Sequence, residues 1–189
     1  MAAQGARSGG GVAIALSCLA LAALAALTAG APAVAGEAAA VPEQWELRSY
    51  WHDGRIDTFE TATTMGQNAA LNVFGYRFVR AECRVFAAQQ PGTIPLQLWW
   101  SEALQDNATV ASTDAIATVK AAGYENKATE GYVYADERPG TVALKLYYSA
   151  KLNDYLTTTA ATGAADALAK GYRFVRIEGY ALPLATADR

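Results

Sequence analysis

The sequence contains one residue pattern three times, at a spacing that stays constant over most of the chain. Gly-Tyr pairs follow one another at intervals of 48 residues, beginning at Gly75, Gly123 and Gly171. Three glutamates keep the same interval, namely Glu82, Glu130 and Glu178. The turn sequence Pro-Gly-Thr occurs at residues 91–93 and again at 139–141. Such regularity predicts three units of like structure, each of which must pack against its neighbours to bury an apolar face.

Each copy is expected to form two strands, a short helix and a third strand. In the third copy, residues 144–149 alternate with the period of a strand, and residues 154–159 form a second, threonine-rich strand. The alanine-rich residues 160–170 predict a helix that ends at Gly171, because glycine readily adopts the conformation found just after helices. A long aromatic strand follows at residues 172–180.

Three similar units in a chain of 189 residues favour closure around a pseudo-threefold axis over a long open solenoid with separate caps. We therefore expect a mainly β fold with short helices, either β-trefoil-like or otherwise closed and three-lobed; a three-repeat stack is the alternative. The single domain is predicted over residues 46–182, followed by a tail at 183–189. Its copies are expected at residues 46–93, 94–141 and 142–182.

The amino terminus has the profile of a signal peptide at residues 1–35. Residues 11–29 carry no charge and are mostly apolar, and the small residues Ala33 and Ala35 suit the subsites of signal peptidase. We expect cleavage between Ala35 and Gly36, a linker at residues 36–45, and a secreted protein without a membrane partner. An uncleaved anchor is the alternative, because an apolar run of 19 residues could span a bilayer.

Composition excludes several classes of protein. A formal net charge of −3 provides no polycationic surface for nucleic acid. A single histidine removes most triad and histidine-rich metal chemistry, so we expect no catalytic residues, no metal and no cofactor. Beyond the signal peptide, Cys83 is the remaining cysteine and stands where the other copies have Gly131 and Gly179. It is therefore predicted to be buried, with an exposed reactive thiol as the alternative.

Aromatic residues at equivalent places in the opening strands are candidates for ligand binding. They are Tyr50, Trp99 and Tyr147. Alternation places them on the face opposite the strand leucines, where an exposed ring could pack against the C–H face of a sugar. The next residues along, which are Trp51, Trp100 and Tyr148, are the predicted core positions. The reverse assignment of the two faces stays open.

One aspartate occupies the same place in each copy, and these three are Asp57, Asp106 and Asp154. They could accept hydrogen bonds from ligand hydroxyl groups, or they could cap turns by accepting bonds from backbone N–H groups. The segment 107–109 is a glycosylation sequon, which would matter only in a eukaryotic host.

We expect structural roles for the repeated glutamates and glycines. Arg80 and Arg176 lie two residues before Glu82 and Glu178, hence on the same strand face, where an ion pair is expected. The middle copy has Ala128 at that position, so Glu130 would need another donor. Gly75, Gly123 and Gly171 are expected to be structural, and Gly123 and Gly171 are predicted to end helices.

The motifs L-x-L-[WY]-[WY]-S, D-x-x-x-T and G-Y-x-F-V-R-x-E-G-Y, in three copies, resemble a family of exported microbial repeat proteins of unknown function. The resemblance extends over roughly residues 46–182. The first copy departs from it by one extra residue before Gly75 and by Cys83-Arg84 in place of Gly-Tyr. The resemblance implies a lectin-like or accessory binding module without catalytic residues.

We therefore expect a secreted, non-enzymatic module that binds carbohydrate or another surface polymer, with three weak sites that gain affinity through multivalency. A protein-interaction or inhibitor module is the alternative, and burial of the three aromatic residues would favour it. A glycoside hydrolase is a remote third reading, since it would need two suitably spaced carboxylates with different pKa values.

Overall fold

A computed structural model of the chain describes residues 40–185. The predicted signal peptide, its cleavage site after Ala35, linker residues 36–39 and tail residues 186–189 lie outside the described residues. Within residues 40–185, no helix is both long enough and apolar enough to cross a membrane.

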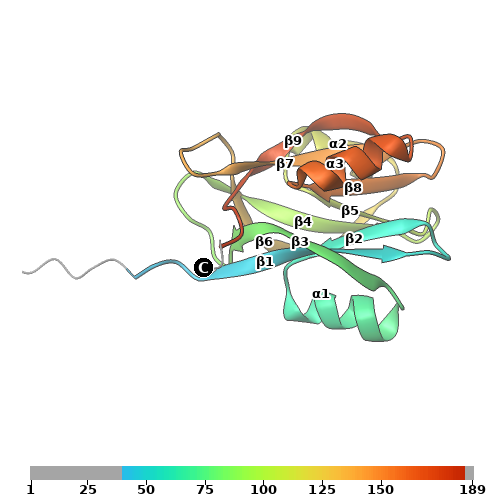
Figure 1. Cartoon of the computed structure of the whole chain (residues 1–189), viewed down its shortest axis with the longest axis horizontal. Helices are drawn as coiled ribbons and strands as arrows, with labels where there is room; N and C mark the ends of the chain where they lie inside the picture. Colours follow the sequence, from blue (N-terminus) through green and yellow to red (C-terminus); the bar gives the residue numbers. More distant parts are fainter. Residues whose placement is uncertain (1–39, 186–189) are drawn as a thin grey trace, which may run out of the picture. The chain divides into compact units, whose positions relative to one another are not determined.

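The order strand, strand, helix, strand occurs three times in succession along the described chain (Figure 1). The first segment comprises β1 (Gln44–His52), β2 (Asp57–Thr61), α1 (Thr64–Asn68) with the π-helical turn η1 (Ala69–Val73), and β3 (Arg77–Phe86). The middle segment comprises β4 (Thr93–Ser101), β5 (Asp106–Val110), α2 (Thr113–Ala121) and β6 (Glu125–Tyr134). The third comprises β7 (Val142–Ser149), β8 (Asp154–Thr158), α3 (Ala161–Ala169) and β9 (Arg173–Ala181).

All strand pairs are antiparallel, and in each segment the opening strand lies between the other two. Single residue pairs join the segments: Phe86 to Tyr132 between β3 and β6, and Tyr134 to Tyr180 between β6 and β9. A further isolated bridge links Arg84 to Leu182. The nine strands of residues 40–185 thus form one open antiparallel sheet.

The expectation of a mainly β chain with short helices is confirmed. The strand pairing does not by itself establish a β-trefoil-like or closed three-lobed arrangement, which stays a prediction.

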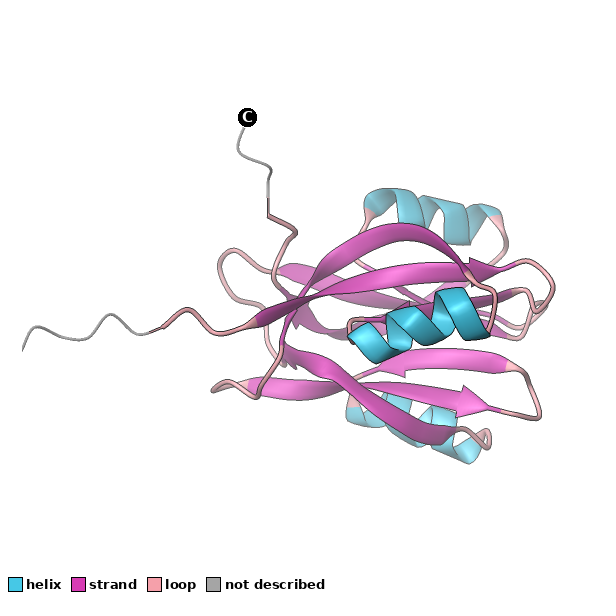
Figure 2. Cartoon of the chain, turned by 90° about the horizontal axis from the view of Figure 1, so that it is seen from below, coloured by secondary structure: helices cyan, strands magenta, loops and turns pink. Residues whose placement is uncertain are grey.

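The centre of the fold is built from the three short strands β2, β5 and β8. Every residue of these strands is buried, and the strands contact one another pairwise. Apolar residues of all three segments form a shared cluster beside them, including Leu47, Leu96 and Leu144, none of which is exposed. The helices lie on the outside of the strands (Figure 2). Aspartates at the start of the three central strands are therefore drawn towards one point.

Helix boundaries follow the residues that the sequence supplies. The hydroxyl groups of Thr63 and Ser112 cap α1 and α2 by accepting bonds from Gly66 N at 3.1 Å and Ala115 N at 3.2 Å. The glycines predicted to end the helices, Gly123 and Gly171, both have φ of 86°. This left-handed conformation is unfavourable for residues with a Cβ, which explains glycine at the ends of α2 and α3.

The extra residue of the first copy is absorbed in its helix. α1 passes directly into η1, so that this helical stretch spans residues 64–73, whereas α2 and α3 contain nine residues each. A π-helical turn is the usual way in which an α-helix accommodates one inserted residue. Consequently Phe74 follows the turn at the place where the other segments have Ala122 and Lys170.

Candidate functional site

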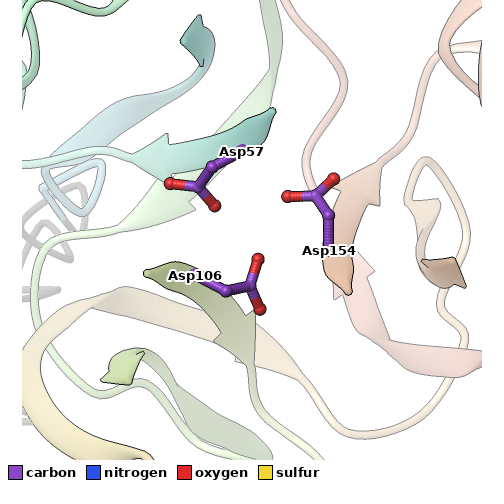
Figure 3. A group of neighbouring side chains, drawn as sticks. All are labelled: Asp57, Asp106 and Asp154. Carbon is purple, nitrogen blue, oxygen red and sulfur yellow. The ribbon is translucent and has the colours of Figure 1, made fainter. Parts of the chain in front are cut away.

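The three repeated aspartates meet in the interior of the protein (Figure 3). Asp57, Asp106 and Asp154 are each at most 1% exposed, and one oxygen from each lies within 4.8 Å of the corresponding oxygens of the other two. They are the first residues of β2, β5 and β8, which explains how one position per segment produces a single cluster.

Each aspartate accepts a hydrogen bond from the tyrosine of its own segment's Gly-Tyr pair, which is Tyr76, Tyr124 or Tyr172. Burial and the adjacent carboxylates raise the pKa of these tyrosines, so their hydroxyl groups stay protonated and act as donors.

Contacts between segments complete the surroundings of two of the aspartates. Asp57 accepts bonds from Asn107 N at 3.0 Å and Asn107 Nδ2 at 2.8 Å, and Asp154 accepts one from Thr58 N at 2.8 Å. In contrast, Asp106 Oδ1 has no hydrogen-bond partner among the described residues. Asp106 is therefore the least compensated member of the cluster.

A proton on Asp106 relieves the repulsion between these carboxylates. Burial, and then the charges of Asp154 and Asp57, raise the pKa of Asp106 to about 11. Burial also raises the pKa of Asp154 to about 7 and that of Asp57 above its usual range. The three oxygens are close enough to surround a cation. However, both oxygens of Asp57 and both of Asp154 already accept protein donors, so a shared proton is sufficient to explain the cluster.

A fourth buried carboxylate, Glu60, lies in the same interior region. Burial and the charges of Glu82, Asp154 and Asp57 raise the pKa of Glu60 well above its usual value. The repeated pattern does not predict Glu60, which stands where the other copies have Thr109 and Thr157.

The aromatic residues expected to form an exposed row are buried, and that expectation of exposure is wrong. Tyr50, Trp99 and Tyr147 are 1%, 8% and 5% exposed. They do lie on the strand face opposite the leucines, as alternation requires, but that face is covered as well. Tyr50, for example, packs in a cluster with Phe59 and Tyr76 of its own segment.

The next residues along each strand are half-buried and contact another side chain that covers the ring. Lys170 Nζ lies 4.6 Å from the ring centroid of Trp51, and Arg55 Cζ lies 5.6 Å from that of Trp100. The ring of Tyr155 lies 4.5 Å from that of Tyr148. The residues predicted as core are thus the more accessible ones.

A cavity of about 450 Å³ lies between the first and middle segments and is called here the main cavity. Its aromatic walls are Phe59, Phe74 and Tyr76 from the first segment and Trp100 from the middle segment. Charged residues from both segments complete the lining, and these are Arg55, Glu102, Lys127 and Glu130.

A smaller cavity of about 220 Å³ lies at the corresponding place between the third and first segments, with Trp51, Leu156 and Tyr172 in its lining. At the remaining contact, between the middle and third segments, Tyr155 packs between Tyr124 and Tyr148 at centroid distances of 6.0 and 4.5 Å. Tyr155 is the counterpart of Asn107 and Thr58, which line the two cavities. One large ring therefore fills a place that smaller side chains leave open.

The repeated glutamates connect each segment to another. The Glu82 carboxylate accepts bonds from Thr158 Oγ1 at 2.6 Å and Thr159 N at 3.1 Å, just before α3. Glu178 Oε2 accepts bonds from Ala111 N and Ser112 N, both at 2.8 Å, just before α2. A carboxylate at the N-terminus of a helix also interacts favourably with the helix dipole.

Glu130 makes the corresponding contacts with the first segment through one of its oxygens. Glu130 Oε2 accepts bonds from Thr61 Oγ1 and Ala62 N, both at 2.7 Å, and from Thr63 N at 3.1 Å. Glu130 Oε1 is buried and has no partner within the described part of the chain. The other two glutamates differ, since Arg80 binds Glu82 Oε1 at 2.6 Å and Ser112 Oγ binds Glu178 Oε1 at 3.2 Å.

A family model matches residues 47–182, and its description is a domain of unknown function, DUF5648. The chain belongs to the DUF5648 family. Neither a curated protein nor a solved structure matches it. The match covers all three segments of this DUF5648 protein, so the two cavities and the aspartate cluster lie within the family's own region.

Two further sequence features of this DUF5648 protein have clear positions. Cys83 is fully buried, and burial raises the pKa of its thiol, in contrast to an exposed reactive cysteine. Asn107, the sequon residue, is 7% exposed, and its amide donates to Asp57 Oδ2 at 2.8 Å and to Tyr76 Oη at 3.1 Å. The folded chain therefore does not present this amide for glycosylation.

Proposed function

We propose that this DUF5648 protein is an exported, non-enzymatic binding module whose main cavity takes part of a carbohydrate or other surface polymer. One observation carries the proposal: aromatic side chains and Glu130, whose buried Oε1 has no partner among the described residues, together line a cavity of about 450 Å³. Ligand sites commonly have this size and combine apolar walls with a few polar groups.

The lining supports a sugar ring as the bound group. The C–H face of a pyranose packs well against an indole such as that of Trp100. Glu102 and Gln105 line the same cavity and provide hydrogen-bond acceptors and donors for hydroxyl groups. The smaller cavity beside Trp51 is a second place for the same polymer.

An approximate threefold relation between the segments, as in a β-trefoil-like fold, is part of this proposal. Three links that join one segment to the next support it, since β3 contacts β6, β6 contacts β9, and Leu182 after β9 contacts Arg84 of β3. Under this relation the two cavities are versions of one site, and binding to a polymer would gain from multivalency.

The test is a glycan array probed with the exported chain and with two tryptophan variants. Trp100→Ala removes the aromatic wall of the main cavity, whereas Trp51→Ala makes the same change at the smaller one. We expect selective binding that Trp100→Ala abolishes and that Trp51→Ala largely retains, with circular dichroism showing both variants folded. An array without bound glycans, or full binding by folded Trp100→Ala, would overturn the carbohydrate proposal.

Export is tested separately by amino-terminal sequencing of protein recovered from culture medium. The expected first residue is Gly36, and retention of the uncleaved chain in the membrane fraction would contradict secretion.

Burial of Tyr50, Trp99 and Tyr147 favours a second candidate, a protein-interaction or inhibitor module. The turn at residues 102–105 is exposed at the edge of the main cavity and offers a contact surface. A protein partner recovered by the full chain, and lost when Leu104 and Gln105 are both replaced by glycine, would support this candidate.

A further inference from the structure

We propose that the main cavity recognises a positively charged nitrogen on its ligand, so that the polymer is one of amino sugars with free amino groups. This inference rests on the proposed function and names its ligand class. The observation behind this inference is a difference between two segments. Glu130 has Ala128 two residues before it, whereas Glu82 has Arg80 at that place.

Equivalent places in the first and middle segments hold different side chains. In the first segment, Arg80 Nε lies 2.6 Å from Glu82 Oε1, and the guanidinium passes over Gly163 of α3. In the middle segment the corresponding residues are Ala128 and Glu130, and the counterpart of Gly163 is Gly66 of α1 in the first segment; all three line the main cavity. Part of the cavity therefore corresponds to the space that a guanidinium fills beside Glu82.

The carboxylate of Glu130 lacks the arginine partner that Glu82 has. Glu130 is 0% exposed, and its Oε1 lacks a donor within residues 40–185. A buried carboxylate oxygen without a donor destabilises the protein, and a cationic donor compensates it better than a neutral one. A ligand ammonium group would restore the pairing that Arg80 provides for Glu82.

Two cationic side chains, Arg55 and Lys127, already line the main cavity. The Arg55 guanidinium lies over aromatic rings, with Cζ 5.5 Å from the centroid of Phe74 and 5.6 Å from that of Trp100. Lys127 Nζ is paired with Glu125 Oε2 at 2.7 Å. Both cations are thus engaged elsewhere, and Glu130 Oε1 keeps no donor within the described part of the chain.

The size and lining of the main cavity indicate which group could carry the ammonium. A cavity of about 450 Å³ has room for more than an ammonium group, and its lining includes four aromatic side chains. An amino sugar combines an apolar ring face with an ammonium group and hydroxyl groups. It therefore matches the aromatic walls, Glu130 and the polar edge at the same time.

The experiment measures affinity by calorimetry for two oligosaccharides with the same backbone, oligomers of glucosamine and oligomers of N-acetylglucosamine. The full exported chain is used at mildly acidic pH, where the free amines are protonated. We expect the glucosamine oligomer to bind at least about tenfold more tightly, and added salt to reduce that preference.

Ala128→Arg is the decisive variant, because it supplies the arginine that the first segment already has. It should weaken binding of the glucosamine oligomer at least about tenfold and raise the melting temperature by about 3 °C, since the new guanidinium pairs with Glu130. Thr129→Arg adds the same charge at the adjacent, exposed position and should leave both properties unchanged. A folded Ala128→Arg variant that binds normally would overturn the inference.

Glu130→Gln tests the charge without filling the cavity. The glutamine retains an acceptor oxygen for Ala62 N and Thr63 N, so the contact with the first segment persists. The expected result is at least about a tenfold loss of affinity for the glucosamine oligomer and little change for the acetylated one.

The outcomes separate the two proposals. Tight binding of the acetylated oligomer together with weak binding of the free amine would overturn the charge inference and leave the carbohydrate proposal standing. If neither oligomer and no other glycan bound, both the carbohydrate proposal and the charge inference would be overturned. Binding of arginine and lysine peptides alone, blocked by Ala128→Arg, would assign the site to a protein and overturn the amino-sugar class.

Discussion

At the scale of single residues, the buried aspartates show how one repeated position acquires different chemistry in each segment. All three accept a tyrosine hydrogen bond, but the residue after each aspartate differs, being Thr58, Asn107 or Tyr155. Asp57 and Asp154 receive donors from a neighbouring segment, whereas Asp106 Oδ1 receives none from the described residues. The proton of the cluster is therefore held most firmly at Asp106.

Asp106→Asn should stabilise the protein at neutral and alkaline pH. The raised pKa of about 11 means that folded Asp106 keeps a proton that the unfolded chain releases above about pH 4. The stability of the native protein therefore falls as pH rises above about 4. An asparagine cannot release a proton, so the variant lacks this pH-dependent loss of stability at residue 106. We expect the free energy of unfolding of the variant to exceed that of the native protein by roughly 1–3 kcal/mol at pH 8.

Denaturant titrations at several pH values measure this difference. The gain should be largest at alkaline pH and shrink towards about pH 4, and the raised pKa values of Asp57 and Asp154 leave a residual slope in the variant. Stability curves of native protein and variant that run parallel would exclude a protonated Asp106.

At the scale of elements, the π-helical turn η1 lies beside the main cavity, because Ala69 of this turn and Phe74 after it both line that space. The corresponding helices α2 and α3 have no inserted residue and are followed by Ala122 and Lys170. Deletion of one residue from η1 should therefore restore the regular length of this helix.

Deletion of Asn72, an exposed residue of η1, should change stability little. The matched control is deletion of Thr118, which is exposed in α2 but precedes the fully buried Val119. The control should rotate Val119 out of the core and lose about 3 kcal/mol or more of the free energy of unfolding. Thermal unfolding compares the two deletions, and equal losses would show that η1 does not accommodate an insertion.

At the scale of the whole molecule, the glutamate contacts join every segment to another. Glu82 binds the third segment, Glu130 the first and Glu178 the middle one, in each case at the residues before a helix. A segment that unfolded alone would leave such a carboxylate, or its backbone partners, without hydrogen bonds. The described residues should therefore unfold in one cooperative transition.

Glu178→Ala should lower the free energy of unfolding by about 3 kcal/mol, because it removes the acceptor for Ala111 N and Ser112 N. Glu125→Ala, which removes an exposed ion pair with Lys127, should change it by less than about 0.5 kcal/mol. Calorimetry should show one transition for both variants. A second, independent transition in Glu178→Ala would disprove coupling between the segments.

The repeat in the sequence was enough to predict the order of strands and helices, and the left-handed glycines after α2 and α3, because these depend on local residues. It was not enough to predict exposure. Alternation correctly separates Leu47 from Tyr50, but it contains no information about what covers the outer face. The main cavity depends on Arg55 and Trp100, which belong to different segments. Its one visible sign was Ala128, the exception to the arginine pattern.

The contrast between Arg80 and Ala128 shows that equivalent positions in one polypeptide can have different roles. A chain built from three like segments can change one copy of a residue and keep the others. Arg80 retains the stabilising pair beside the smaller cavity, whereas Glu130, near Ala128 at the main cavity, has no such pair among the described residues. One copy can change its binding properties while the other copies keep the fold stable. A chain without internal copies cannot separate the two roles in this way.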